Sequence, residues 1–150
     1  MNTVRKLKHE EAKDKGYKIL SYIHPTAIVQ TEIIGEGTIV FEGVIIGPFT
    51  QIGNGNVIYP KAHIAHNTIV GNFNFFTISC AIAGNVLIDD HCFFGNNCTL
   101  KNDIHVSNFS LIGAAAYLDR NADSPGGVYV PARSIKLANR NSMDIDLTKS

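Results

Sequence analysis

The chain has 150 residues, with 13 basic and 13 acidic side chains and a formal net charge of +0 at pH 7. This length fits one domain, and the balanced charge excludes the basic surface that nucleic-acid-binding proteins use. No apolar run is long enough to cross a membrane, and the basic first residues precede no signal-like apolar core. We therefore expect a cytoplasmic protein that neither enters a membrane nor binds nucleic acid.

The first segment, residues 1–23, differs from everything that follows it. Residues 3–15 are rich in charged side chains and predict a short helix, which Gly16 is placed to end. Residues 17–23 predict a strand. We expect this segment to cap the repetitive structure that begins at residue 24.

A six-residue repeat organises the middle of the chain. Every sixth residue from 28 to 118 is hydrophobic, although only 45% of the chain is. Sixteen such positions in a row have a chance probability on the order of 10⁻⁵, even allowing for the choice of register. The positions are Ile28, Ile34, Val40, Ile46, Ile52, Ile58, Ile64, Val70, Phe76, Ile82, Ile88, Phe94, Leu100, Val106, Ile112 and Leu118. The residues after them are rich in Gly, Asn, Asp and Pro, which suit tight corners.

These short apolar segments predict a stacked coil. They are too short for hairpins, but three of them can make one turn, which places residues 18 apart at the strand spacing of about 4.8 Å. Residues 24–118 are thus expected to form an all-β triangular solenoid of about five coils, with three hexapeptides per coil. The pattern resembles the left-handed parallel β-helix. Residues 119–150 are predicted to be a polar loop and a C-terminal tail.

Two further sets of side chains follow from this arrangement. Cys80, Cys92 and Cys98 fall on small inward positions, so we expect them to be buried thiols, and no metal-binding spacing is present. On one face, each residue just before an inward residue is also apolar and should point outward. This outer stripe comprises Ile39, Val57, Phe75, Phe93 and Leu111. An apolar stripe of this kind predicts a contact surface between subunits.

His66 is the candidate catalytic residue that the sequence itself singles out. It lies at a corner, off the apolar repeat, with Pro48 one coil below and Gly84 one coil above. Because glycine has no side chain, there is room beside the imidazole, and imidazole accepts a proton near neutral pH. A solvated corner histidine without chemistry is the alternative interpretation of this residue.

Over residues 24–136 the pattern resembles the hexapeptide-repeat acyltransferases. Residues 24–27, 65–73 and 83–86 are similar to bacterial sugar acyltransferases, which include sialic acid O-acetyltransferases and N-acetyltransferases of nucleotide-linked amino sugars. The resemblance implies transfer of an acetyl group from acetyl-CoA to a hydroxyl or amine of a sugar, with no metal. It also implies a homotrimer in which acetyl-CoA lies between neighbouring subunits.

The resemblance implies roles for individual residues as well. His66 would be the general base, Asn67 would orient it, and His63 and Phe75 would contact the acceptor. The positions implied for acetyl-CoA are Gly84 and Asn85 near the thioester, Gly113, Ala114 and Ala115 along the pantetheine arm, and Ala132 and Arg133 near the nucleotide.

Two of these positions depart from the pattern of the family. Asn67 stands where an acidic residue is common, and Phe75 stands where a second histidine is often found. An amide can orient an imidazole but cannot stabilise an imidazolium as a carboxylate does.

The alternative function is a non-catalytic β-helix that binds a sugar or serves in assembly. A β-helical carbonic anhydrase is disfavoured, because no two histidines are five residues apart.

Overall fold

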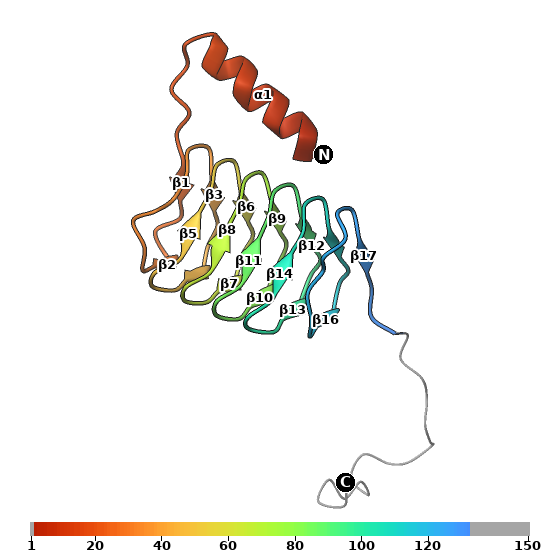
Figure 1. Cartoon of the computed structure of the whole chain (residues 1–150). Helices are drawn as coiled ribbons and strands as arrows, with labels where there is room; N and C mark the ends of the chain where they lie inside the picture. The colour runs from red at the N-terminus through yellow and green to blue at the C-terminus, as the bar shows by residue number, and fades with distance from the viewer. Residues whose placement is uncertain (1, 133–150) are drawn as a thin grey trace, which may run out of the picture.

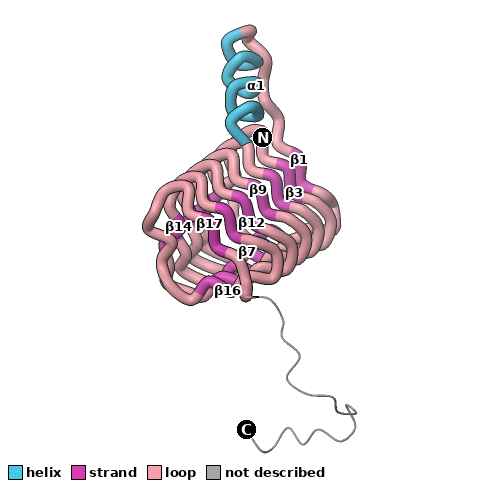
Figure 2. The backbone as a smooth tube through the Cα atoms, turned by 90° about the vertical axis from the view of Figure 1, so that its right-hand side faces the viewer, coloured by secondary structure: helices cyan, strands magenta, loops and turns pink. Residues whose placement is uncertain are grey.

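The computed structural model describes residues 2–132, in which one helix, α1 (Asn2–Asp14), precedes a solenoid of short parallel strands (Figure 1). The strands form three sheets, the faces of a left-handed parallel β-helix, and α1 lies outside it (Figure 2). The predicted fold is confirmed, but with about six coils instead of about five. The extra strands lie outside the repeat, at residues 22–23 and 128–129.

Each sheet stacks strands from successive coils. The first sheet contains β2 (Ile28–Val29), β4 (Ile45–Ile46), β7 (His63–Ile64), β10 (Ala81–Ile82), β13 (Thr99–Leu100) and β16 (Tyr117–Leu118). The second contains β5 (Gln51–Ile52), β8 (Ile69–Val70), β11 (Leu87–Ile88) and β14 (His105–Val106). The third contains β1 (Tyr22–Ile23), β3 (Ile39–Val40), β6 (Val57–Ile58), β9 (Phe75–Phe76), β12 (Phe93–Phe94), β15 (Leu111–Ile112) and β17 (Val128–Tyr129).

The predicted register is correct except at its first position. Ile28 pairs with Ile45 and is 56% exposed, whereas Val29 pairs with Ile46 and occupies the expected inward place. Because Ile34 bridges Ile52 in the predicted register, the corner between residues 29 and 34 has one residue fewer than the others. Residues 28 and 29 are both apolar, so the hydrophobic pattern could not distinguish them.

The core consists of the predicted inward ladders. Phe76 and Phe94 are fully buried, and their rings stack with centroids 4.6 Å apart and planes 1° apart. Cys80, Cys92 and Cys98 are free and buried, as expected. Burial raises the pKa of the Cys92 thiol to about 12, so this side chain is a small neutral core residue.

Each regular corner contains one residue in the left-handed backbone conformation. These residues recur every six positions from 37 to 115, with φ between 56° and 67°. Glycine occupies three of the positions, and Asn67 and Asn85 are among the others. Asparagine tolerates this conformation better than most residues. The repetition means that corner side chains 18 residues apart form rows along the solenoid.

The helix α1 lies beside the coils and does not cover their open end. Arg5 reaches from α1 to the corner that joins the second and third sheets. Its guanidinium donates to the main-chain oxygens of Gly55 at 2.9 Å, Phe73 at 3.0 Å and Asn74 at 3.2 Å. Half-burial there lowers the pKa of Arg5. We expected residues 1–23 to cap the first coil. Of this segment, it is β1 and not α1 that lies at the end of the solenoid, as the outermost strand of the third sheet.

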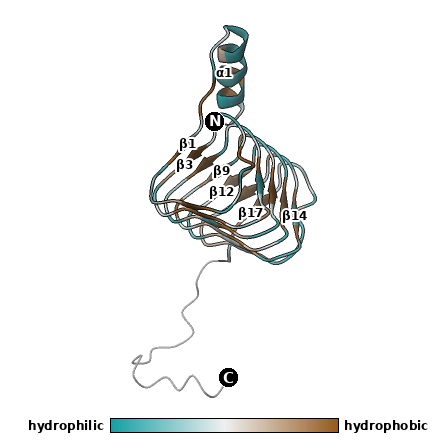
Figure 3. Ribbon diagram, turned by 90° about the vertical axis from the view of Figure 1, so that its left-hand side faces the viewer, coloured by the Kyte–Doolittle hydropathy of each residue, from teal (hydrophilic) through white to brown (hydrophobic). Residues whose placement is uncertain are grey.

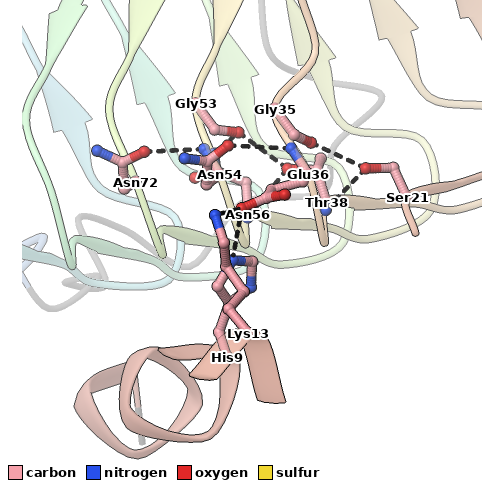
Figure 4. Close-up of polar contacts among 10 residues, drawn as sticks. All are labelled: His9, Lys13, Ser21, Gly35, Glu36, Thr38, Gly53, Asn54, Asn56 and Asn72. Carbon is pink, nitrogen blue, oxygen red and sulfur yellow. Dashed lines mark hydrogen bonds and ion pairs between the residues drawn. The ribbon is translucent and has the colours of Figure 1, made fainter. Parts of the chain in front are cut away.

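A second contact of α1 is made by Glu36 (Figure 4). Its carboxylate accepts from Lys13 and, at 3.2 Å, from His9, and these hydrogen bonds lower the pKa of Glu36. The main-chain N–H of Glu36 donates to Asn54, the first amide of a row that continues at Asn72. Within residues 2–132, no helix is long and apolar enough to cross a membrane.

Candidate active site

His66 lies on the corner that joins the first and second sheets, between β7 and β8, and its side chain is exposed. The corner is fixed by its main chain. The carbonyl of His66 accepts from the N–H of Asn85 at 3.0 Å, and the N–H of Asn67 donates to the carbonyl of Pro48 at 3.0 Å. An exposed imidazole is therefore presented from a rigid turn.

Asn67 orients the imidazole. Its Oδ1 lies 2.9 Å from Nδ1 of His66. An amide oxygen can only accept a hydrogen bond, so Nδ1 of His66 carries the proton and donates it. This tautomer leaves a lone pair on Nε2, which is the arrangement that a general base requires.

The imidazole lies over Gly84. A Cβ atom built on Gly84 would be 2.5 Å from Cε1 and 2.7 Å from Nε2 of His66. These distances are shorter than the contacts that real Cβ atoms make, so the ring can occupy this position only because residue 84 is glycine. In the part of the chain that the structure describes, no hydrogen bond uses the main-chain N–H of Gly84.

Two other predicted residues belong to the same part of the surface. Asn85 follows Gly84 and bonds to the carbonyl of His66, as described above. His63 is exposed on the outer face of the first sheet, where it pairs with Ala81, a residue with a small side chain. The structure thus places His66, Asn67, Gly84 and Asn85 on one edge of the solenoid, and His63 on the adjoining face of the first sheet.

The remaining predicted residues lie elsewhere in the single chain. Phe75 points outward from the third sheet, with the guanidinium of Arg5 5.7 Å from its ring centroid. The 113–115 segment forms a corner between the third and first sheets, and Ala132 follows β17. Arg133 lies outside the described residues. One chain alone therefore does not bring these positions to His66.

The sequence interpretation missed Asp103, which stands one coil beyond Asn85 on the same corner. Its carboxylate accepts from Nδ2 of Asn85 at 2.7 Å and from Nδ2 of Asn102. The spacing of 18 residues from Asn85 was a signal that could have revealed it. Asp103 also lines an open pocket of about 610 Å³ that extends along this corner to Arg120 and Asp123.

Within residues 2–132, no three His, Cys, Asp or Glu side chains are grouped as metal ligands would be. The candidate site is instead built from an imidazole, two corner amides, a carboxylate and the main-chain N–H of Gly84. Such groups can accept a proton and donate hydrogen bonds to a developing oxyanion.

Comparisons with known proteins agree on the fold. No protein-family model and no curated protein matches the sequence. Among solved structures, the acetyltransferase domain of PglB from Neisseria gonorrhoeae FA1090 has a TM-score of 0.84 and 22% identity. PerB from Caulobacter crescentus, solved with CoA and GDP-perosamine, has a TM-score of 0.83 and 25% identity. Both matches cover 87% of this chain and 63% of the other chain.

WeeI from Acinetobacter baumannii AYE is a more distant match, with a TM-score of 0.60 and 17% identity over 81% of this chain and 61% of that chain. This chain therefore spans less than two thirds of the length of these solved proteins. It has the β-solenoid fold of the hexapeptide-repeat sugar acetyltransferases, and the predicted resemblance is confirmed at the level of structure.

Proposed function

We propose that this chain transfers an acetyl group from acetyl-CoA to an amine or hydroxyl of a nucleotide-linked sugar. The observation that carries the proposal is the position of His66 over Gly84, with Nδ1 bonded to Asn67 and Nε2 left as the proton acceptor. Structural neighbours support the choice of substrates. The PglB domain was solved with acetyl-CoA, and PerB with CoA and GDP-perosamine.

In the proposed reaction, the acceptor's N–H or O–H hydrogen-bonds to Nε2 of His66. The acceptor attacks the thioester carbonyl as Nε2 takes its proton, and the N–H of Gly84 donates to the oxyanion that forms. When the tetrahedral intermediate collapses, the C–S bond breaks and the proton on Nε2 goes to the leaving thiolate. The products are the acetylated sugar and CoA thiol, so the histidine returns to its starting state.

The proposal includes a homotrimer. The outer stripe Ile39, Val57, Phe75, Phe93 and Leu111 lies on the third sheet, whose strands are hydrophobic along their length (Figure 3). A second copy that covers this stripe would hide apolar surface. It would also allow the 113–115 corner of one subunit to face the His66 corner of its neighbour, where acetyl-CoA is proposed to bind. Acetyl-CoA is present in the cytoplasm, which is the location predicted from the sequence.

The second candidate function is a non-catalytic β-helix that binds a sugar or a partner subunit. Asn67 favours this second function, because an amide stabilises an imidazolium less than the carboxylate that is common at this position.

A measurement of acceptor-dependent thiol release distinguishes the two functions. The protein is incubated with acetyl-CoA and a panel of nucleotide-linked amino sugars, and free thiol is measured. Acceptor-dependent thiol release supports the transferase, whereas tight acetyl-CoA binding by calorimetry without thiol release from any acceptor supports the binding protein.

A further inference from the structure

A second pair of polar side chains follows His66 and Asn67 along the same corner. Asn85 and Asp103 stand one and two coils beyond Asn67, and both have left-handed backbone angles, with φ of 58° and 62°. Nδ2 of Asn85 donates to Oδ1 of Asp103 at 2.7 Å, and Nδ2 of Asn102 donates to the other carboxylate oxygen. Asp103 thus holds two amide groups on the surface that leads away from the imidazole.

The hydrogen bond to Asp103 fixes the direction of the Asn85 amide. Because its NH₂ group faces the carboxylate, its Oδ1 is left as an acceptor. No hydrogen bond of residues 2–132 uses that Oδ1. The main chain of Asn85 is fixed at the same time, because its N–H donates to the carbonyl of His66 at 3.0 Å. Asn85 is therefore held between the proposed base and Asp103, with an oriented acceptor on its exposed side.

The exposure of Asn85 and Asp103 indicates that their hydrogen bond contributes to binding more than to stability. Asn85, Asn102 and Asp103 are all exposed. Hydrogen bonds in water contribute little to folding, because water replaces them when they break. An amide whose orientation is fixed in advance, however, loses less entropy when it binds a ligand. Loss of Asp103 should therefore affect substrate binding more than unfolding.

We propose that Asp103 is a positioning residue of the acyl-transfer site, which acts through Asn85. It holds Oδ1 of Asn85 in place to accept a hydrogen bond from an N–H group of a bound substrate. This inference rests on the proposed function. Two substrates offer such a group: the pantetheine arm of acetyl-CoA has amide N–H groups, and an amino-sugar acceptor has an amine. The open pocket that Asp103 lines gives the remainder of the ligand room along the corner.

The test compares steady-state kinetics of the unmutated protein, Asp103→Ala and Asp103→Asn. Asparagine tolerates the left-handed backbone and retains one acceptor oxygen, so it can keep the hydrogen bond to Asn85 while removing the charge. Alanine removes both. We expect Asp103→Ala to raise one KM by about three- to ten-fold, with kcat changed less than about two-fold. Asp103→Asn should restore most of that loss.

Phe109→Ala is the matched control. Phe109 is an exposed corner residue with φ of 61°, on the edge that joins the second and third sheets, so it shows what an alanine substitution costs in this backbone conformation. Its kinetic constants should equal those of the unmutated protein. All variants should melt within about 4 °C of the unmutated protein, since only exposed side chains change.

The KM that rises identifies the hydrogen-bonded substrate. A higher KM for acetyl-CoA indicates a pantetheine amide, and a higher KM for the acceptor indicates its amine. If Asp103→Asn loses as much as Asp103→Ala, the charge alone matters and the proposal is overturned. It is also overturned if both KM values stay within about two-fold in Asp103→Ala while His66→Ala lowers turnover by about 10²-fold or more, which leaves the proposed function intact. If the unmutated protein turns over no acceptor, both proposals fail as stated.

Discussion

The imidazole of His66 occupies the space that a side chain at position 84 would need. Gly84→Ala therefore tests the site without removing any functional group. A Cβ there would lie 2.5 Å from Cε1 of His66, and the exposed imidazole would have to move. We expect turnover to fall about 10²-fold, because misplacing a catalytic group by about 1 Å costs that much. The melting temperature should hardly change, since Gly84 does not have a left-handed φ and the displaced group is an exposed side chain.

The same substitution in a His66→Ala background is its control. With the imidazole gone, Gly84→Ala has nothing to displace and should cause no further loss of turnover. An equal loss in both backgrounds would show that position 84 acts on the substrate or the backbone and not on His66.

The stacked aromatic ladder predicts a large loss of stability on truncation. Phe94→Ala leaves a cavity beside the ring of Phe76, which is 4.6 Å away and equally buried. We expect the free energy of unfolding to fall by about 3–5 kcal/mol in a denaturant titration. Phe109→Ala is the comparison, because Phe109 is 52% exposed and its loss should cost under about 1 kcal/mol. Equal costs for the two substitutions would mean that the inward register is wrong.

The attachment of α1 should depend on pH through Glu36. The hydrogen bonds from Lys13 and His9 hold the pKa of Glu36 below its usual value of 4.5. A carboxylate with a lowered pKa stabilises the docked helix above that usual value and loses this contribution as the pH falls through the lower one. Hydrogen exchange of α1, corrected for its intrinsic pH dependence, should therefore increase in acid. Glu36→Gln should show the faster exchange already at pH 7. Exchange that is the same in both proteins at pH 7 would contradict the role of Glu36.

The third sheet should be the interface of the proposed trimer. Phe93 lies in the outer stripe, stacked on Phe75 with centroids 5.6 Å apart, and Phe93→Asp would place a charge among apolar side chains. Light scattering should report a trimer for the unmutated protein and a monomer or aggregate for Phe93→Asp. Leu87→Asp makes the same kind of change, from an apolar to a charged side chain, on the second sheet, and this variant should remain trimeric. A monodisperse monomer of the unmutated protein would refute the interface.

Hydrophobic spacing predicted the fold because each inward residue contributes to one continuous core. Ile64 and Val70 are buried as the repeat requires, and the displayed position of His66 followed from its place off the repeat. The error at Ile28 arose because its neighbour Val29 is equally apolar. The location of α1 could not be predicted, since it depends on contacts of Arg5 with main-chain oxygens, which leave no periodic signal.

The candidate site was predictable where it depends on the spacing of 18 residues. That spacing placed Gly84 beside His66, and it relates Asn85 to Asp103 in the same way. It could not place Phe75 or Gly113 near His66, because Phe75 lies on the third sheet and Gly113 on the corner between the third and first sheets. Their proposed contribution depends on a second subunit, which the periodicity of one chain does not describe.

The most direct test of the central claim is the turnover of His66→Ala with acetyl-CoA and the best acceptor from the panel. General-base assistance contributes about 10²–10⁴ in rate, and turnover should fall by that factor. The acetyl-CoA affinity measured by calorimetry should stay within about two-fold of that of the unmutated protein, because His66 is exposed and outside the core. For the same reason, light scattering should still report a trimer. Turnover that is unchanged in His66→Ala would contradict the proposed mechanism.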